Sequence, residues 1–460
     1  MPMNRQCISF ASTLTERRHN AAGPSAAFLL EKSAGPRRFP SVTDATNEIA
    51  DSPVWARADA FAPAPQGWGW LDVKRRQHPS ESFEALAKAV RDDRQSTILL
   101  VWTPEQARMC LPEEVDGLDA AMAVARERWT QDDLSAATTR LRWFSILLAG
   151  FATQAFFQAM TQLAKAAAHF GQVLEWRQRV MLAGRAVLGS MPLGLAMLLF
   201  VMFGFIPWYQ ARKRRAELAS WNPAGTAARV PALRFETWLE LQRAPTTMVL
   251  LSLMGLVGLA QLLPGDSIAA AGLVKSDYLR GEWWRLFTAP FLHGNIVHFL
   301  MNMAALAYLG KRLEVFARWP HLALVFVFAA VVGGDASAMW VKANSVGASG
   351  GLMGWLGFLI VFETLHGKLA PRSARRRLIA GVLLTAGIGL LGYRFIDNAA
   401  HLGGLLAGMT YAAIVFPKSA SPKRPGSTFT DLLAGSAALA VLVAAAGLAI
   451  WHIAGAGAVH

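Results

Sequence analysis

A serine and a histidine set in apolar sequence are the residues of this chain whose types and spacing could do chemistry. Ser349 stands between small residues in Gly347-Ala348-Ser349-Gly350, and His401 follows 52 positions later in a second apolar stretch. A neutral imidazole can remove the proton of a serine hydroxyl and later return it to a leaving amine. Ionisable groups are costly inside a membrane and point to function. The pair therefore predicts hydrolysis within a lipid bilayer by a Ser349–His401 dyad.

Hydrolysis through a tetrahedral intermediate also needs hydrogen-bond donors directed at the developing oxyanion. His298 and Asn302 are spaced i, i+4, so they face the same way on one helix. We predict that they form the oxyanion site together with the backbone N–H of Ser349. A hydrogen bond between helices is the alternative role for Asn302.

No acidic residue completes a triad. Asp397 lies four residues before His401 at the expected entrance of a helix, where capping that helix is favoured over orienting the imidazole. Asp335 is predicted to pack or to lie at the membrane interface rather than to act in catalysis.

Glycines accompany both candidate residues. Gly350 and Gly354 follow the serine, and Gly404 and Gly408 follow the histidine, each pair in a GxxxG pattern. Small residues at this spacing let two helix backbones approach closely. A Ser–His hydrogen bond across two helices requires such an approach.

The composition predicts the surroundings of this site. Of 460 residues 53% are hydrophobic and 17% charged, whereas soluble domains carry about 25% charged residues. The net charge of +14 arises beside the apolar runs, which the positive-inside rule explains without a nucleic-acid partner. Cys7 and Cys110 lack metal-ligand spacing, so neither a disulfide framework nor a structural zinc site is predicted.

Apolar runs of about 18 residues or more, long enough to cross a hydrocarbon core of roughly 30 Å, recur in the second half. The predicted spans are 246–264, 292–310, 319–340, 349–366, 378–395, 398–416 and 430–453. If the first runs from inside to outside, the cytoplasmic loops hold 18 Lys or Arg and the opposite loops 5, as expected for that orientation. Ser349, His401 and His298 then lie at a similar depth near the outer face.

The first half is predicted to contain three regions. Residues 1–47 lack periodicity and are expected to be disordered. Residues 48–140 form a small soluble α/β module without a recognisable catalytic motif, including a buried strand over 97–102 and helices near 82–92 and 118–129.

Residues 141–245 contain one or two membrane segments and a basic cytoplasmic linker. The segment 186–208 is a predicted span, ended by the run Arg212 to Arg215. The segment 143–163 is interrupted by two glutamines, so either a span or an amphipathic helix on the membrane surface is possible.

Five motifs in order resemble the rhomboid intramembrane serine proteases. They are Gly281 to Thr288 (GEWWRLFT), His293 to Asn302 (HGNIVHFLMN), Tyr308-Leu309-Gly310 with Glu314, the GASG motif at Gly347–Gly350, and Ala400-His401 with Gly404 and Gly408. The resemblance covers residues 246–416, little more than a third of the chain.

The resemblance implies an all-α polytopic fold with a six-helix core over 246–416, to which 417–460 adds a linker and an extra transmembrane helix. It implies Ser349 as nucleophile, His401 as general base, and His298 and Asn302 at the oxyanion site. It also places Trp284 and Arg285 in a membrane-embedded outer loop between the first two core helices. Such proteases cut transmembrane substrates near the outer membrane boundary and require no metal or cofactor.

Met353 departs from the family pattern. Many rhomboids carry an aromatic residue four positions after the nucleophile, which stacks on the catalytic histidine. A thioether is a softer contact for an imidazole, so the resemblance implies a less firmly positioned base here, without loss of activity.

Other classes of function remain as alternatives. A rhomboid-like protein that binds membrane clients without cutting them would lack the serine or the histidine, and both are present. A transporter would show inverted repeats or helices interrupted at the midplane, and the sequence shows neither. The composition favours a bacterial inner membrane, with a mitochondrial inner membrane as the alternative. The expected partners are the lipid bilayer and transmembrane protein substrates; the sequence indicates no oligomeric state.

Overall fold

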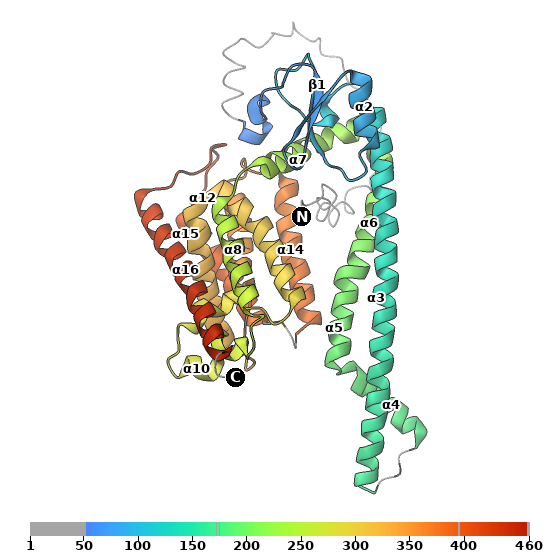
Figure 1. The fold of residues 1–460 in the computed structure, drawn as a ribbon, viewed down its shortest axis with the longest axis vertical. Coiled ribbons are helices and arrows are strands. Elements are labelled where there is room, and N and C mark those ends of the chain that lie inside the picture. Colours follow the sequence, from blue (N-terminus) through green and yellow to red (C-terminus); the bar gives the residue numbers. More distant parts are fainter. Residues whose placement is uncertain (1–51, 172, 174, 394–395, 458–460) are drawn as a thin grey trace, which may run out of the picture. The chain divides into compact units, whose positions relative to one another are not determined.

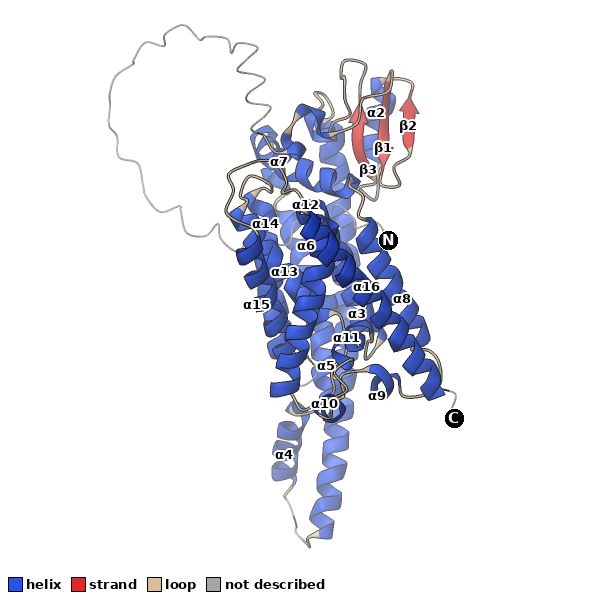
Figure 2. Ribbon diagram, turned by 90° about the vertical axis from the view of Figure 1, so that its left-hand side faces the viewer, coloured by secondary structure: helices blue, strands red, loops and turns tan. Residues whose placement is uncertain are grey.

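The computed structural model describes residues 52–171, 173, 175–393 and 396–457. The predicted disordered segment 1–47 lies outside the described residues. The described chain forms two compact units, one of residues 62–230 with 383–393 and 396, the other of 52–61, 231–382 and 397–457. Helices make up most of both units, and three strands form one small sheet (Figure 2).

The sheet belongs to the first unit. Its antiparallel order is β2-β1-β3, with β1 at Trp68–Asp72, β2 at Gln77–Ser80 and β3 at Ile98–Trp102. All five residues of β3 are buried, which confirms the predicted buried strand. Helix α2 (Phe83–Asp92) begins where the Ser82 hydroxyl accepts a hydrogen bond from the third residue beyond it, as an N-cap serine does.

The first unit also holds a helical hairpin. Helix α3 (Asp119–His169) runs without a break for 51 residues, so the predicted helix near 118–129 and the apolar segment 143–163 belong to one helix. An ion pair of 3.1 Å joins Asp133 of α3 to Arg214 of α6. The remaining elements are α4 (Trp176–Leu188), α5 (Met191–Leu199), a π-helical turn (Phe200–Phe205), α6 (Ile206–Ala216), and short 3₁₀ turns at Pro112–Glu114 and Leu218–Ser220.

The second unit contains the helices of the predicted core (Figure 1). Over its described residues, each span predicted in the second half of the chain coincides for most of its length with a helix. The helices are α7 (Pro223–Leu241, which begins in the first unit), α8 (Pro245–Ala260), α12 (Ile296–Trp340), α13 (Ser349–Leu365), α14 (Arg372–Leu391, which ends in the first unit), α15 (Asn398–Val415) and α16 (Phe429–Gly457). Shorter helices are α9 (Ser267–Ala271), α10 (Lys275–Leu279), α11 (Arg285–Thr288) and 3₁₀ turns at Val54–Ala56, Ala58–Ala60 and Ala289–Phe291.

Two predicted spans, 292–310 and 319–340, adjoin within α12 without the expected intervening loop. The helical path breaks at Arg318, which has φ 70° and ψ 163°. Pro320 follows two residues later and has no N–H for the helical ladder. The chain therefore changes direction over one residue.

Several described helices have the length and hydropathy needed to cross a membrane. These are α3, Pro192–Ala216, α12 and Phe429–Ala456; α7 with α8, bent by 64°, adds a fifth if that pair is one span. The protein is accordingly a multi-pass helical membrane protein.

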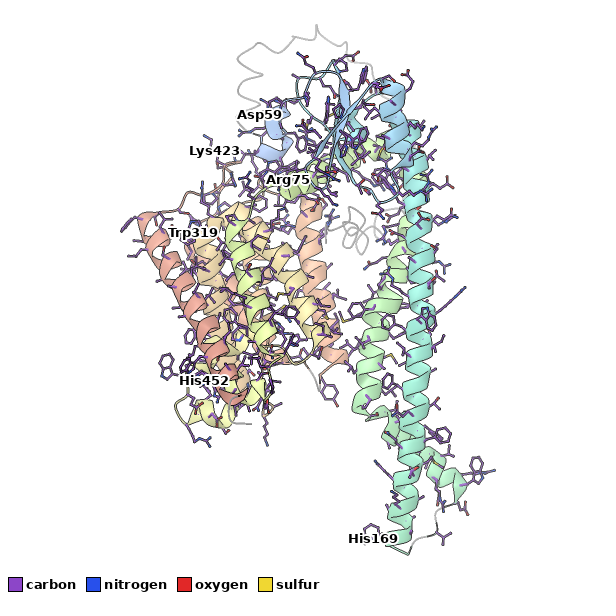
Figure 3. The ribbon with its side chains drawn as sticks, viewed as in Figure 1. Asp59, Arg75, His169, Trp319, Lys423 and His452 are labelled. Carbon is purple, nitrogen blue, oxygen red and sulfur yellow. The ribbon has the colours of Figure 1, made fainter. Side chains whose placement is uncertain are left out.

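Helix α16, outside the predicted six-helix core, packs closely on the second unit. It contacts α8, α9, α11 and α12. At Gly435 an added Cβ would lie 2.5 Å from the Cα of Pro320, so the two backbones touch there. Near its other end His452 stacks on Trp284, with ring centroids 4.3 Å apart and planes at 3°. Figure 3 shows His452 and Trp319 toward opposite ends of the helices of this unit.

A fully buried ion pair joins α12 to α13. Arg312 donates from Nε and Nη2 to the two carboxylate oxygens of Glu363, at 2.6 and 2.8 Å. Beside it Glu314 accepts from the backbone N–H groups of Thr246 and Thr247, at 2.9 and 2.8 Å, and so caps the start of α8. Three helices are thus fixed to one another at this end.

We expect Glu363→Ala to destabilise the protein by about 3–5 kcal/mol, because it leaves the Arg312 charge buried without a partner. Thermal unfolding in detergent would measure this. The double variant Arg312→Met/Glu363→Leu should recover most of the loss. Arg280→Ala, which breaks an exposed pair with Asp277, is the matched control and should cost less than about 1 kcal/mol. A Glu363→Ala protein as stable as wild type would contradict the expectation.

Candidate active site

A pocket opens between the start of α13, the start of α15, the second half of α12 and the segment around η8 (Ala289–Phe291). Polar side chains and glycines line it together with apolar residues; among them are Ser349, Gly350, Ser345, Ser337, Asp397 and Gly347. All of these belong to the second unit. The serine singled out from the sequence therefore lies at a cavity, half-buried, at the first position of its helix.

Gly347 positions the turn that leads into Ser349. Its φ of 122° is a conformation that only glycine adopts without strain. Its N–H donates to the carbonyl of Ala289 at 3.0 Å. A Cβ at this position would lie 2.6 Å from Cε1 of His298, so the His298 ring packs directly against the turn. The His298 ring thus lies against a residue that is two positions before Ser349 in the chain.

Helices α13 and α15 touch through their glycines. An added Cβ at Gly404 would overlap the carbonyl of Gly350, and one at Gly408 would overlap the carbonyl of Gly354. The four glycines of the two GxxxG patterns therefore face one another at the helix crossing. Because the backbones meet here, the first turns carrying Ser349 and His401 lie side by side.

His401 occupies the first turn of α15, where its N–H donates to the carbonyl of Asp397 at 3.1 Å. Its Nδ1 is buried and has no hydrogen-bond partner among the described residues. Within the same part of the chain no hydrogen bond joins His401 to Ser349.

Asp397 has the capping role predicted for it. Its Oδ1 accepts from the backbone N–H of Ala400 at 2.9 Å. Its other oxygen accepts from the hydroxyls of Ser337 and Ser345. Asp335 accepts a hydrogen bond from the hydroxyl of Tyr278 at 2.8 Å.

Asn302 and His298 lie one turn apart on α12. The side chain of Asn302 is buried and donates to the carbonyl of His298 at 2.8 Å. The His298 N–H is capped by Asn295 at 2.9 Å. The structure places His298 against the serine turn. Among the described residues the hydrogen bond of the Asn302 side chain goes to its own helix and none joins it to Ser349.

Trp284 and Arg285 lie between α8 and α12, at the start of α11. Arg285 is buried and donates to the carbonyls of Ala269 and Gly272 at 3.0 and 2.8 Å, which holds the loop together. Trp284 faces His452 of α16, a contact that no local sequence signal predicts. Met353 is buried in α13.

Comparisons with known proteins agree with this architecture. Residues 280–418 match the model of the Rhomboid domain. The chain is 30% identical over 211 residues to rhomboid protease GlpG of Yersinia pseudotuberculosis, covering 43% of this chain and 73% of that protein. It is 31% identical over 156 residues to rhomboid protease GluP of Bacillus subtilis, covering 34% and 31% of the two chains. RHOMBOID-like protein 6, mitochondrial, of Arabidopsis thaliana is 36% identical over 138 residues, covering 29% and 44%.

The fold and site define a multi-pass membrane protein with a serine-lined pocket between its helices. The chain belongs to the rhomboid family. It spans less than half the length of the Bacillus and Arabidopsis relatives.

Proposed function

We propose that the chain is an intramembrane serine endopeptidase that hydrolyses peptide bonds of transmembrane proteins near the outer membrane boundary. Ser349 is the nucleophile and His401 the general base. The observation that carries this proposal is the crossing of α13 and α15 at Gly350 and Gly404, which sets the first turns of the two helices together beside one pocket.

In this mechanism His401 takes the proton of the Ser349 hydroxyl as its oxygen attacks the substrate carbonyl. The tetrahedral intermediate then collapses, the C–N bond breaks, and His401 passes the proton to the leaving amine. Water, deprotonated by His401, releases the acyl group and regenerates the serine. No acid contacts Nδ1 of His401 within the described residues, which supports a dyad rather than a triad.

The negative charge of the intermediate requires donors near Ser349. The first N–H groups of a helix have no intrahelical acceptor, and Ser349 is the first residue of α13. Its N–H is therefore an oxyanion donor in this proposal, joined by the side chains of His298 and Asn302. The contact between the His298 ring and Gly347 supports the assignment of His298 as a donor.

The proposed enzyme acts on membrane proteins within a lipid bilayer. Its partners are the lipid bilayer and single-pass or multi-pass transmembrane substrates, and its location is the inner membrane of a bacterium. Two relatives are named as proteases, GlpG and GluP. The chemistry assigned to Ser349 and His401 needs no metal or cofactor.

Labelling with a fluorophosphonate, which forms a covalent bond with an activated serine oxygen, tests the proposal. We expect the wild-type protein in lipid to be labelled and Ser349→Ala not to be labelled. Ser252→Ala, which removes an exposed serine of α8, is the control and should label like wild type. An unlabelled wild-type protein that still retains membrane clients would favour the non-catalytic alternative.

A further inference from the structure

A polar network forms part of the pocket wall, and the proposed mechanism does not use it. Lys275, the first residue of α10, is 6% exposed, and Ser337 of α12 is fully buried. The Lys275 ammonium donates to the hydroxyl of Ser345 at 3.0 Å and to that of Ser337. Both hydroxyls donate to Oδ2 of Asp397. A cation and a carboxylate from distant elements are thus joined through two serines.

The direction of the hydrogen bonds that link Lys275 to Asp397 is fixed by the number of protons; the two serine hydroxyls also lie 2.9 Å from each other. A serine hydroxyl has one proton, an ammonium has only donors, and a carboxylate has only acceptors. Each serine therefore accepts from Lys275 and donates to Asp397. A buried charge is costly unless it is paired and hydrogen-bonded, and the two hydroxyls connect the buried Lys275 ammonium to the half-buried Asp397 carboxylate. Removing Asp397 leaves the Lys275 charge buried without its counter-charge.

The network ends on both segments that carry the proposed dyad. Asp397 caps α15 through the N–H of Ala400 at 2.9 Å, and its carbonyl accepts from the N–H of His401 at 3.1 Å. Ser345 lies four residues before Ser349. Its backbone pairs with that of Leu273, two residues before Lys275, by N–H to O bonds of 2.9 and 3.1 Å.

We propose that Lys275, through Ser337, Ser345 and Asp397, positions the first turn of α15 relative to the Gly347–Ser349 turn. Lys275 and Asp397 are positioning residues in this inference, which rests on the proposed function of Ser349 and His401. The loop between α8 and α12 thereby fixes the distance between nucleophile and base. Asp397 lines the pocket together with Ser337 and Ser345, and Lys275 lies behind them.

Other polar groups near the network have partners of their own. Tyr278, on α10 with Lys275, donates to Asp335 of α12 at 2.8 Å, a separate link between the same two elements. Asp397 is the charge that acts on Lys275; burial lowers the pKa of Lys275 to about 8, and the attraction of Asp397 opposes this shift. His401 is the titratable group next to Asp397 on α15. We therefore expect the alkaline limb of an activity profile to report Lys275.

The test compares rates of fluorophosphonate labelling of Ser349 in the full-length protein in lipid. We expect Lys275→Met and Asp397→Asn each to slow labelling about 10- to 100-fold, since a displacement near 1 Å can cost that much. The double variant should be no slower than the worse single variant, because both substitutions break one unit. Lys342→Met is the matched control: it removes an exposed lysine from the loop that precedes Ser349 and should label like wild type.

The pH profile separates positioning from mere stability. Wild-type labelling should fall as the pH rises through about 8, when the Lys275 ammonium loses its charge. Lys275→Arg keeps a cation that does not titrate in this range. We therefore expect this variant to label faster than Lys275→Met and to show no fall in labelling rate at alkaline pH. Background hydrolysis of the probe is subtracted with Ser349→Ala.

Two results would overturn the inference. One is labelling of Lys275→Met and Asp397→Asn at the wild-type rate. The other is an alkaline fall that persists unchanged in Lys275→Arg. In both cases wild type still labels at Ser349 and the proposed function stands. Failure of wild type itself to label contradicts the proposed function instead.

Discussion

Ser349→Ala and His401→Ala are each expected to reduce cleavage of a model transmembrane substrate to the background rate. The loss in kcat is on the order of 10⁶-fold, as for other serine–histidine units, where one missing member removes nearly the whole effect. The double variant should lose no more than either single variant. The physical reason is that a serine without a base is a poor nucleophile, and a base without a serine has no proton to take.

Cleavage in lipid vesicles, measured as product formed per enzyme, would check this. His366→Ala is the control histidine: it lies at the end of α13 remote from the first turn, with its Nδ1 near the carbonyl of Phe362. Its loss should leave kcat within a few-fold of wild type. If each single variant lost only a small part of kcat and the losses added in the double variant, Ser349 and His401 would act independently. That result would rule out the dyad.

Gly404→Val is expected to separate α15 from α13 and to lower kcat/KM by about 100-fold or more. A side chain at Gly404 would overlap the carbonyl of Gly350, and backbone atoms cannot rotate away as a side chain can. The helices must therefore move apart, which costs about 1–3 kcal/mol of stability. It also displaces His401 from Ser349, and displacements near 1 Å reduce catalysis steeply.

The matched control is Gly447→Val in α16, where an added Cβ meets nothing within 4 Å. Its unfolding temperature and cleavage rate should equal those of wild type. Gly404→Ala should lie between Gly404→Val and wild type. A Gly404→Val protein with wild-type kcat/KM would mean that the distance between the first turns of α13 and α15 does not limit the reaction.

The sequence predicts the helices of the second half because each is a long apolar run, and hydrophobic length is a local property. Its pattern of glycines also predicts which helices approach closely. Pairings between distant residues are different. Arg312 and Glu363 are 51 positions apart, and Lys275 and Ser345 are 70 apart. No periodicity in a single sequence indicates such partners, although a lone charge in apolar surroundings shows that one must exist.

Other differences have local causes. The uninterrupted length of α3 is not evident from hydropathy, since its first part is polar and its later part apolar; helix-forming residues, not burial, continue it. The break at Arg318 within α12 replaces a predicted loop by a single residue. At the site, Gly347 could be predicted as part of a motif, but its contact with His298 depends on how α12 and the serine turn pack.

Because α16 packs on one side of the second unit, the sides of this unit differ in whether a helix of the same chain covers them. One flank, formed by α8 and α12, is already covered by a helix of this same chain, in backbone contact at Gly435 and stacked at His452. Residues 416–428 join α16 to α15, so its effective concentration at this flank exceeds that of any separate helix diffusing in the bilayer. A separate helix could therefore pack on this flank only by displacing α16.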